Sequence, residues 1–556
     1  MLWYKKNEYD TNKFGLPVFL MNQHNTPAFP RDYIQKALLA SLVILLGIFW
    51  LFFFYSVCIR LLYLFELDWI EGEVMCHVIR FLEGKSMYPP PSMEFVAEIY
   101  PPFYYLVVAL FTKILGVSML AGRAVSVLAC LCVTFMLYKI CLKETGSRSL
   151  AFICSSFFIA LYHIHGPWYD MARVDMLFFA LILGGCFVLC YYKNKVWGLS
   201  CAVMLLVLGC YTKQNGVIYL GFLALYLLAS HWKKGLLFAG LAIVLLAGLF
   251  FLLNLATDGW FGQYTFFNLL GYKNNMASAL PSAYHHLVEE IRVRLPTEMR
   301  YELFFKLPVF VIMGLSYLFY RLISRGGFKN FSLWEYMAIA GALTYFLVRP
   351  HPGSEKNDLI NLTLWGCILL GMALSHMARL PDRHAAGTAF CTALFLLAVQ
   401  LCLLLYDPRS DLPYPGSEEK GSEFIARVRS MQGEVYIPYH SFYGVMAGKK
   451  MIFNAGAFWG YQMLSPGTYT PGDLIEKINK KYFAAIIIDD TSYYTLLGRR
   501  VEFDNISLLL SAREPLSQAI GNNYKAVGRI AYQNIDEFRN PTGFMTRPEI
   551  ILAPEG

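Results

Sequence analysis

Apolar runs of roughly 20 residues recur along the first 406 residues of this chain. Each is long enough to cross about 30 Å of hydrocarbon as a helix. Only 15% of all residues are charged, whereas soluble domains average about 25%. Lipid must therefore solvate much of the surface, and the sequence predicts a polytopic α-helical membrane protein.

Basic clusters occupy every second connection between these runs, which is the pattern of cytoplasmic loops. It predicts eleven spans with a cytoplasmic N-terminus, near residues 33–63, 121–138, 149–166, 174–192, 197–212, 216–231, 235–256, 305–323, 332–348, 359–378 and 386–406. The run 101–115 starts with two prolines and contains Lys113. Counting it as a span would invert the alternation, so we expect it to lie along the interface.

The net charge of +8 is explained by these loops. Membrane topology accounts for it better than a nucleic-acid partner does. All thirteen cysteines precede residue 403, mostly inside apolar runs, without Cys-x-x-Cys spacing. Neither a disulfide framework nor a zinc motif is indicated.

The composition changes after Asp407, where the stretch DPRSDLPYPGSEEKGSE is rich in proline, glycine and acids. It predicts a boundary between a membrane part, 1–406, and a soluble part, 407–556. GEVYIPYH, YFAAIIIDD and YKAVGRIAY are typical of strands, while 422–431 and PGDLIEKINKK are typical of helices. We expect a small α/β domain on the outer face, where Asp489 and Asp490 are best explained as a solvated strand end.

The first outer loop, 64–120, contains a stretch (66–105) packed with acids, aromatic residues and prolines. Its acids are candidates for a general base, with Glu71 first and Asp68, Glu73 and Glu66 as alternatives. Gly72 permits a close approach, and a helix is expected to run from Glu73 to about residue 82. For Glu73 a purely structural role at the helix start is equally compatible with the pattern.

Cations suited to a phosphate appear at the ends of later spans. Arg123 opens one span, Arg173 lies in YDMARVDML, and Lys213 interrupts an apolar stretch in YTKQNG. The alternation of loops puts all these ends on the outer face. The candidate residues for binding a phosphate group or a sugar are Arg123, Arg173, Asp175, Lys213, Gln214, His351, Lys356 and Asn357.

A metal is not required by any spacing in the chain. Asp170 with Asp175, or Glu73 with His77, offers ligands for a divalent cation, but each pair also has an arginine as an ion-pair partner. We therefore expect no obligatory cofactor. His285 and His286 are assigned to an amphipathic interface helix, HHLVEEIRVRL.

Six short motifs, WIEGE, IYPPFYY, AGRAVS, ARVDM, YTKQ and HPGSEKN, resemble the GT-C superfamily of integral-membrane glycosyltransferases. The chain is similar to the bacterial branch with aminoarabinose transferases and relatives of protein O-mannosyltransferases. The resemblance implies a bacterial plasma-membrane enzyme, a polyprenyl-phosphate-linked sugar donor and inverting single displacement at the outer face. It maps the base onto Glu71, but many relatives have Asp-Glu where this chain has Ile70-Glu71, so Asp68 and Glu73 stay open.

Two other functions fit a polytopic chain with outward-facing charges. A transporter or flippase of lipid-linked saccharides would also gather cations near lipid phosphates, but transporters favour internal repeats and charges at mid-membrane. A non-catalytic assembly factor would not need acids and cations at the same face. The acceptor, whether glycan, lipid or protein, has no signature in the sequence.

Overall fold

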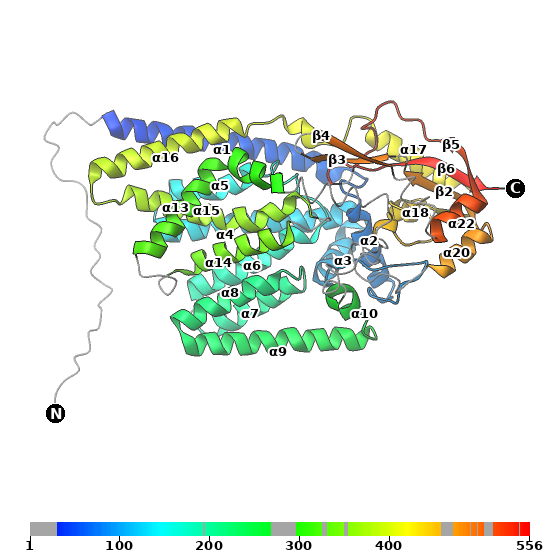
Figure 1. Ribbon diagram of the computed structural model, residues 1–556, viewed down its shortest axis with the longest axis horizontal. Helices are drawn as coiled ribbons and strands as arrows, with labels where there is room; N and C mark the ends of the chain where they lie inside the picture. Colours follow the sequence, from blue (N-terminus) through cyan, green and yellow to red (C-terminus); the bar gives the residue numbers. More distant parts are fainter. Residues whose placement is uncertain are drawn as a thin grey trace.

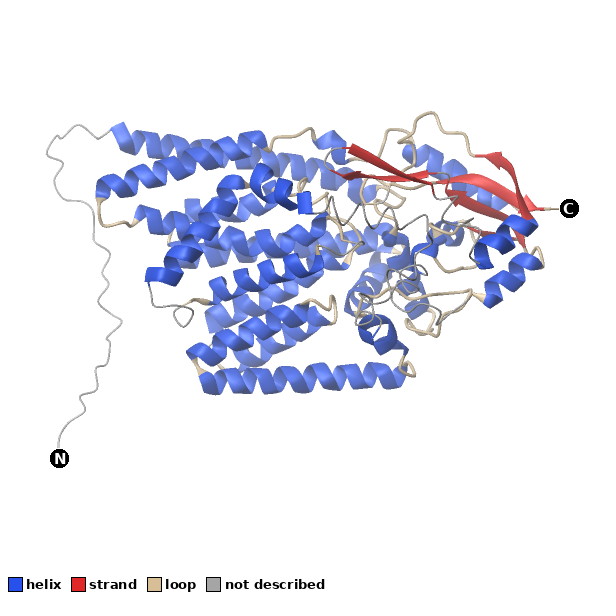
Figure 2. Ribbon diagram, viewed as in Figure 1, coloured by secondary structure: helices blue, strands red, loops and turns tan. Residues whose placement is uncertain are grey.

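The computed structural model describes residues 30–192, 195–267, 296–297, 299–324, 331–349, 354–457, 471–489, 491–496, 499–504, 515–543 and 545–555. A bundle of long helices occupies one end of the molecule, and all strands lie at the other end (Figures 1 and 2). The expected order of a helical part followed by a smaller α/β part is therefore present.

A helix occupies each of the eleven expected spans. These helices are α1 (Pro30–Leu62), α4 (Met119–Thr145), α5 (Arg148–Ala160), α6 (Val174–Tyr192), α7 (Val196–Cys210), α8 (Gly216–Ser230), α9 (Trp232–Ala256), α13 (Pro308–Ser324), α14 (Leu333–Val348), α15 (Ile360–Ala378) and α16 (Arg383–Leu403). Within the described chain, six helices are long and apolar enough to cross a membrane: α1, α4, α6, α9, α15 with the turn before it, and α16. The chain is thus a multi-pass membrane protein, while the full number of spans stays a prediction.

The run 101–115 forms a separate short helix, α3 (Phe103–Leu115), which packs against α4 and against α2 (Ile70–Leu82). Its other side carries Leu110 and Ile114, which are 61% and 85% exposed. An apolar exposed side is what an interfacial helix presents to lipid. The prediction that it lies along the membrane surface stands as a prediction.

The two ends of the bundle differ in chemistry. Where α1 and α7 end and α4, α6 and α15 begin, acids and bases are buried together; we call this the site end. At the opposite end, Arg379 donates to the Thr145 carbonyl at 2.8 Å, the Lys143 ammonium lies 4.4 Å from the Tyr191 ring centre, and a buried ion pair joins Arg321 to Glu335 at 2.7 Å. More of the buried charges lie at the site end, and the sidedness read from the alternation of loops stays a prediction.

The C-terminal part contains a four-stranded sheet of order β1-β2-β6-β5. Its strands are β1 (Glu434–Tyr436), β2 (Phe483–Asp489), β5 (Tyr524–Arg529) and β6 (Pro548–Pro554), with β1 parallel to β2 and the other pairs antiparallel. A separate hairpin pairs β3 (Thr491–Leu496) with β4 (Arg499–Asp504). Sequence reasoning located β1, β2 and β5 but not β6 or the hairpin.

The helices of this part are α17 (Ser417–Ser430), α18 (Ser441–Met446), α20 (Gly472–Asn479) and α22 (Pro515–Asn523). The expected helix 422–431 begins five residues earlier, because Gly416 takes a φ of +88° and Glu418 and Glu419 favour the first turn. The expected strand 433–440 stops at Tyr436, two residues before Pro438, whose nitrogen cannot donate to a sheet.

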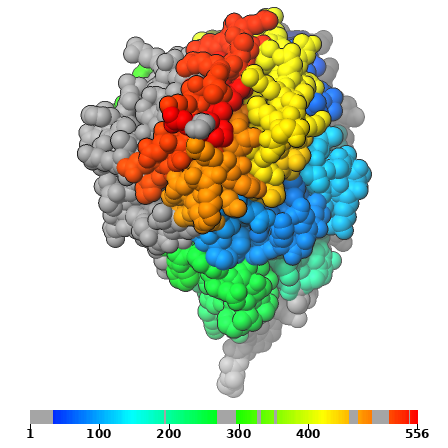
Figure 3. All heavy atoms as spheres, turned by 90° about the vertical axis from the view of Figure 1, so that its right-hand side faces the viewer, coloured from blue at the N-terminus to red at the C-terminus, as the bar shows by residue number. Residues whose placement is uncertain are grey.

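The C-terminal part shares a hydrophobic core with the first loop. Phe65 packs edge-on against Phe538 and Tyr443, at ring-centre distances of 5.2 and 5.8 Å. A Cβ on Gly421 of α17 would lie 2.5 Å from Phe65. In Figure 3 the yellow, orange and red C-terminal segments cover one end of the molecule, with the blue first-loop segment directly beside them. The boundary near residue 407 stays a prediction, and the two parts pack closely.

Candidate active site

Helix α2 carries the acidic motif and is anchored by Glu71. Arg123 donates to both of its carboxylate oxygens, from Nε to Oε1 at 3.0 Å and from Nη2 to Oε2 at 2.6 Å. The backbone N–H groups of Ala172 and Leu67 also donate to this carboxylate, each at 2.7 Å. Both side chains of the ion pair are fully buried. Glu71 therefore joins α2, α4 and the segment before α6.

Every hydrogen-bond donor of the Arg123 side chain is engaged within the protein. Besides Glu71, it donates to the backbone carbonyls of Arg60, Tyr63 and Phe65, where α1 ends and the loop begins. Together these contacts occupy all five N–H groups of a guanidinium. The last carbonyls of a helix have no partner within it, and Arg123 supplies one. The geometry therefore leaves Arg123 no donor for a lipid phosphate.

Glu71 is a weak candidate for a base on the same grounds. Its four donors match the four lone-pair sites of a carboxylate. Burial opposes ionisation of Glu71, but Arg123 and the two backbone N–H groups outweigh it and lower the pKa below the ordinary value. The close approach expected at Gly72 is present, because a Cβ there would lie 2.1 Å from Glu66 Oε1.

Asp68 lies three residues earlier in a different environment. Its Oδ2 accepts from Arg173 Nη1 at 2.6 Å, and both side chains are buried. Burial raises the pKa of Asp68 to about 6, against the opposing effect of the Arg173 charge. A carboxylate with a pKa near neutrality is suited to taking up a proton at physiological pH. The Arg173 Nε has no hydrogen-bond partner among the described residues.

Asp175 organises the neighbouring cluster at the site end. Its Oδ1 accepts from Lys213 Nζ at 2.7 Å and from Asn357 Nδ2 at 2.9 Å. Its Oδ2 accepts from the indole N–H of Trp168 at 3.0 Å, and Lys213 also lies 3.7 Å from Asp358. The structure thus brings together four predicted residues from three separate regions: Arg173, Asp175, Lys213 and Asn357.

The remaining predicted residues differ in whether their polar groups are free to contact a ligand. Gln214 donates to the backbone carbonyls of Ile99 and of Thr265, so its amide nitrogen holds protein segments together. Lys356 packs its aliphatic stem on Gly166, with Cβ and Cδ both 3.4 Å from the position of an added Cβ. Within the described chain the Lys356 ammonium forms no ion pair. His351, His285, His286 and Asp490 lie outside the described residues.

Glu73 and His77 face the interior beneath the loop. His77 Nδ1 donates to the Glu73 carbonyl at 2.8 Å, and Nε2 accepts from the Glu98 N–H at 3.2 Å. This pattern requires a neutral ring, and burial lowers the pKa of His77 to about 4. Both ring nitrogens are thus engaged, which leaves none for a metal ion. Asp170 is likewise held by Arg60, at 2.7 Å.

Sequence reasoning did not single out Glu98, which lies just before the YPP motif. It is buried, its Oε1 has no partner among the described residues, and burial raises its pKa to about 7. The positive charge of nearby Arg173 opposes this rise in the pKa of Glu98 without cancelling it. An acid next to a double proline in a polar loop is a signal that a sequence search can use.

His440 was also missed, and it lies between two acids from distant segments. Its Nδ1 is 2.6 Å from Glu66 Oε2 and its Nε2 is 3.3 Å from Asp489 Oδ2, with all three side chains buried. Burial favours the neutral ring, but the two carboxylates outweigh it and raise the pKa of His440 to about 10. Asp489, expected at a solvated strand end, is instead buried at 0% exposure.

Replacing His440 by glutamine should destabilise the protein by about 3–5 kcal/mol near pH 6, because two buried carboxylates lose their counter-charge. The raised pKa makes this stabilisation complete below pH 6.5 and removes it as the pH rises through about 10. Thermal unfolding of both proteins from pH 6 to pH 10 measures the difference, which should shrink with pH. The control is His231→Gln, because His231 is exposed. If the stability difference between wild type and His440→Gln stays constant with pH, His440 is not the charged partner of the two carboxylates.

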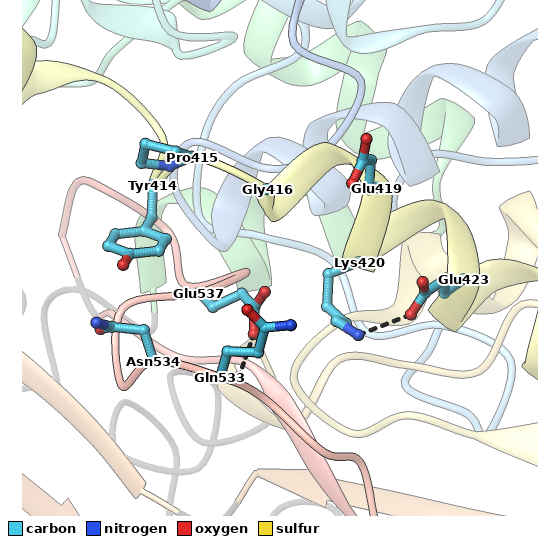
Figure 4. A pocket seen from close by; sticks show the side chains of 9 residues that line it. All are labelled: Tyr414, Pro415, Gly416, Glu419, Lys420, Glu423, Gln533, Asn534 and Glu537. Atoms are coloured by element: carbon cyan, nitrogen blue, oxygen red, sulfur yellow. Dashed lines mark hydrogen bonds and ion pairs between the residues drawn. The ribbon is translucent and has the colours of Figure 1, made fainter.

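A polar hollow of about 410 Å³ lies elsewhere, between α17 and the segment 533–537 (Figure 4). It is lined by Glu419, Lys420 and Glu537, among others, and Lys420 is paired with Glu423 at 2.7 Å. None of the predicted site residues lines it.

No protein-family model matches the sequence, and no curated protein matches it. Among solved structures, ArnT from Cupriavidus metallidurans bound to undecaprenyl phosphate has a TM-score of 0.53, with 12% identity over 92% of this chain and 97% of that chain. The apo state of the same protein has a TM-score of 0.52, with 11% identity over the same shares.

This chain has the GT-C fold. The resemblance read from the motifs is confirmed at that level, because the match covers nearly the whole length of both chains. The archaeal oligosaccharyltransferase AglB from Archaeoglobus fulgidus, in complex with an inhibitory peptide and a dolichol-phosphate, is also similar, with 11% identity and a TM-score of 0.48 over 91% of this chain and 80% of that one. In this GT-C fold, the buried acids and bases gather at the site end, beside the C-terminal part.

Proposed function

We propose that this protein is a glycosyltransferase that moves a sugar from a polyprenyl-phosphate carrier to an acceptor hydroxyl. The proposal rests on one observation: Asp68, Arg173, Lys213 and Asn357 meet at one end of a GT-C fold whose structural neighbour binds undecaprenyl phosphate. We place the site at the outer face of a bacterial plasma membrane, with the N-terminus cytoplasmic and the C-terminal domain periplasmic or extracellular. No cofactor is required by this scheme.

The proposed reaction is a single displacement with inversion. Asp68 takes the proton from the acceptor hydroxyl while that oxygen attacks the anomeric carbon. The bond between this carbon and the phosphate oxygen breaks, and the phosphate leaves with the electron pair. Cationic side chains stabilise the charge that develops on it. One glycosidic bond replaces one sugar–phosphate bond, and the proton ends on Asp68.

Asp68 replaces Glu71 as the proposed base because of the difference in their partners. Four donors occupy Glu71, whereas the Asp68 carboxylate is held chiefly by Arg173, at 2.6 Å. A donor phosphate that binds Arg173 competes with this contact and frees an Asp68 oxygen for the acceptor. Glu71 and Arg123 then have a structural task, which is to hold α2 against α4.

Lys356 is the cation best placed to meet a phosphate without disturbing the fold. Lys213 compensates Asp175 and Asp358, so removing it leaves buried carboxylates unpaired. Lys356 is only partly buried and has no such duty among the described residues. Lys356→Ala should weaken binding of undecaprenyl phosphate by about tenfold, which corresponds to about 1.4 kcal/mol. The matched control is Lys139→Ala. Lys139 is also partly buried, but it lies near the C-terminal end of α4, away from the site end.

Titration of the purified protein with undecaprenyl phosphate measures both variants. Equal affinities for wild type and Lys356→Ala, or an equal loss in both variants, would contradict the phosphate contact.

Activity is tested with the full chain in lipid nanodiscs and a panel of radiolabelled undecaprenyl-phosphate sugars. We expect one donor to be consumed, with release of undecaprenyl phosphate and transfer of label. If no donor is cleaved, but labelled lipid crosses the bilayer of proteoliposomes that contain the protein, the flippase alternative replaces this proposal.

A further inference from the structure

The C-terminal part reaches the proposed base through a short segment, 540–543. The Thr542 N–H donates to the Leu67 carbonyl at 3.2 Å, next to Asp68. With its amide oriented to satisfy both neighbours, Asn540 donates to the Glu66 carbonyl at 3.3 Å and accepts from the Trp69 N–H at 3.0 Å. These contacts bracket the backbone on both sides of Asp68.

Gly543 makes the closest approach in this segment. A Cβ at this position would lie 2.6 Å from Asp68 Oδ1, a distance that real Cβ contacts do not show. It would also lie 4.0 Å from the ring of Trp168, which donates to Asp175. The bare backbone of Gly543 therefore lies against Oδ1 of Asp68, whereas Arg173 binds Oδ2.

The segment is held firmly from its own side. The Arg539 guanidinium donates to the carbonyls of Ile535 and Met545, each at 2.6 Å. Arg547 donates to the carbonyls of Asn534 and Glu537, at 2.8 and 2.7 Å. Buried charge-assisted hydrogen bonds of this kind restrict a loop to one conformation. Residues on both sides of Gly543 are therefore anchored within the C-terminal part.

We propose that Gly543 is a positioning residue for Asp68, so that the C-terminal domain completes the catalytic site of the membrane part. This inference rests on the proposed function of Asp68. Its physical content is steric: a methyl group at 543 displaces Oδ1 and weakens the contact between Oδ2 and Arg173. The active geometry thus depends on a residue of the C-terminal part that lies 475 positions (543 − 68) downstream of the base.

The test compares Gly543→Ala with Gly448→Ala in the full chain. Both glycines have positive φ, +67° and +78°, so alanine strains the backbone at each. Only Gly543 faces Asp68, since a Cβ on Gly448 meets nothing within 4 Å. We expect a loss of thermal stability in both variants, with a larger loss in Gly543→Ala because its methyl group also meets Asp68. Transfer by Gly543→Ala should fall at least about tenfold in kcat with the KM for the donor nearly unchanged, whereas Gly448→Ala keeps the wild-type kcat.

A second readout does not depend on turnover. In infrared difference spectra of the wild type, the carboxyl band of protonated Asp68, identified by its loss in Asp68→Asn, is expected to titrate near pH 6, because burial raises the pKa of Asp68. This midpoint should move in Gly543→Ala and stay in place in Gly448→Ala. An unchanged midpoint, or the same change in both variants, overturns the positioning role. If the wild type transfers no sugar while the midpoint moves as expected, the proposed function fails and the contact with Asp68 stands.

Discussion

Asp68→Asn is expected to lower the transfer rate by about 100- to 10,000-fold, the usual contribution of a general base. Asparagine keeps the shape of the side chain and still accepts a hydrogen bond from Arg173, whose charge Asp175 and Glu98 also partly balance, so the fold should persist. The measurement is turnover of the donor found by the nanodisc assay, with thermal unfolding recorded in parallel. Binding of undecaprenyl phosphate should be retained, because the cations are unchanged.

The pH dependence of the same reaction gives an independent check. Because the pKa of Asp68 is raised to about 6, the carboxyl is protonated and inactive below that pH. The rate should therefore rise with pH and reach half its maximum near pH 6. Glu98 is the alternative candidate for the base, because its pKa is raised to about 7, and Glu98→Gln tests it. If Glu98→Gln abolishes turnover and Asp68→Asn does not, Glu98 is the base.

Arg123→Leu is expected to destabilise the protein by about 3–5 kcal/mol, because it removes one member of a buried ion pair. The substitution leaves the Glu71 carboxylate buried without its counter-charge and removes the donors to three carbonyls at the end of α1. Yield of folded protein and thermal unfolding in detergent measure this loss.

The double variant Arg123→Leu/Glu71→Leu is the informative control. Replacing both members of a buried ion pair with apolar residues costs much less than removing one. We therefore expect the double variant to recover a large part of the lost stability. A folded, stable Arg123→Leu variant with impaired binding of undecaprenyl phosphate would instead restore Arg123 as a phosphate ligand.

Much of the architecture follows from local sequence. The apolar runs gave the positions of the membrane helices because each run carries enough hydrophobic length by itself. The alternation of basic loops separated the two ends of the bundle, and so indicated that Asp68, Arg173 and Lys213 share one end. Strand β2 was visible because its residues FAAIIID form a continuous apolar run.

The ion-pair partners of the charged residues could not be predicted from the sequence. Asp170 lies three residues from Arg173 in sequence, yet it binds Arg60, and Arg173 binds Asp68. A buried ion pair depends on where side chains meet after helices pack, and sequence distance does not report this. For the same reason Glu71 looked like a free acid, although its carboxylate is fully occupied.

The sequence by itself determined that this chain crosses a membrane, because hydrophobic length acts locally, and it predicted that most of the candidate site residues share one end of the bundle. Tertiary structure alone decided which acid keeps a usable lone pair, and that Gly543 lies against Asp68. Those outcomes depend on contacts between segments hundreds of residues apart, where burial and the number of hydrogen-bond donors set the chemistry of each carboxylate.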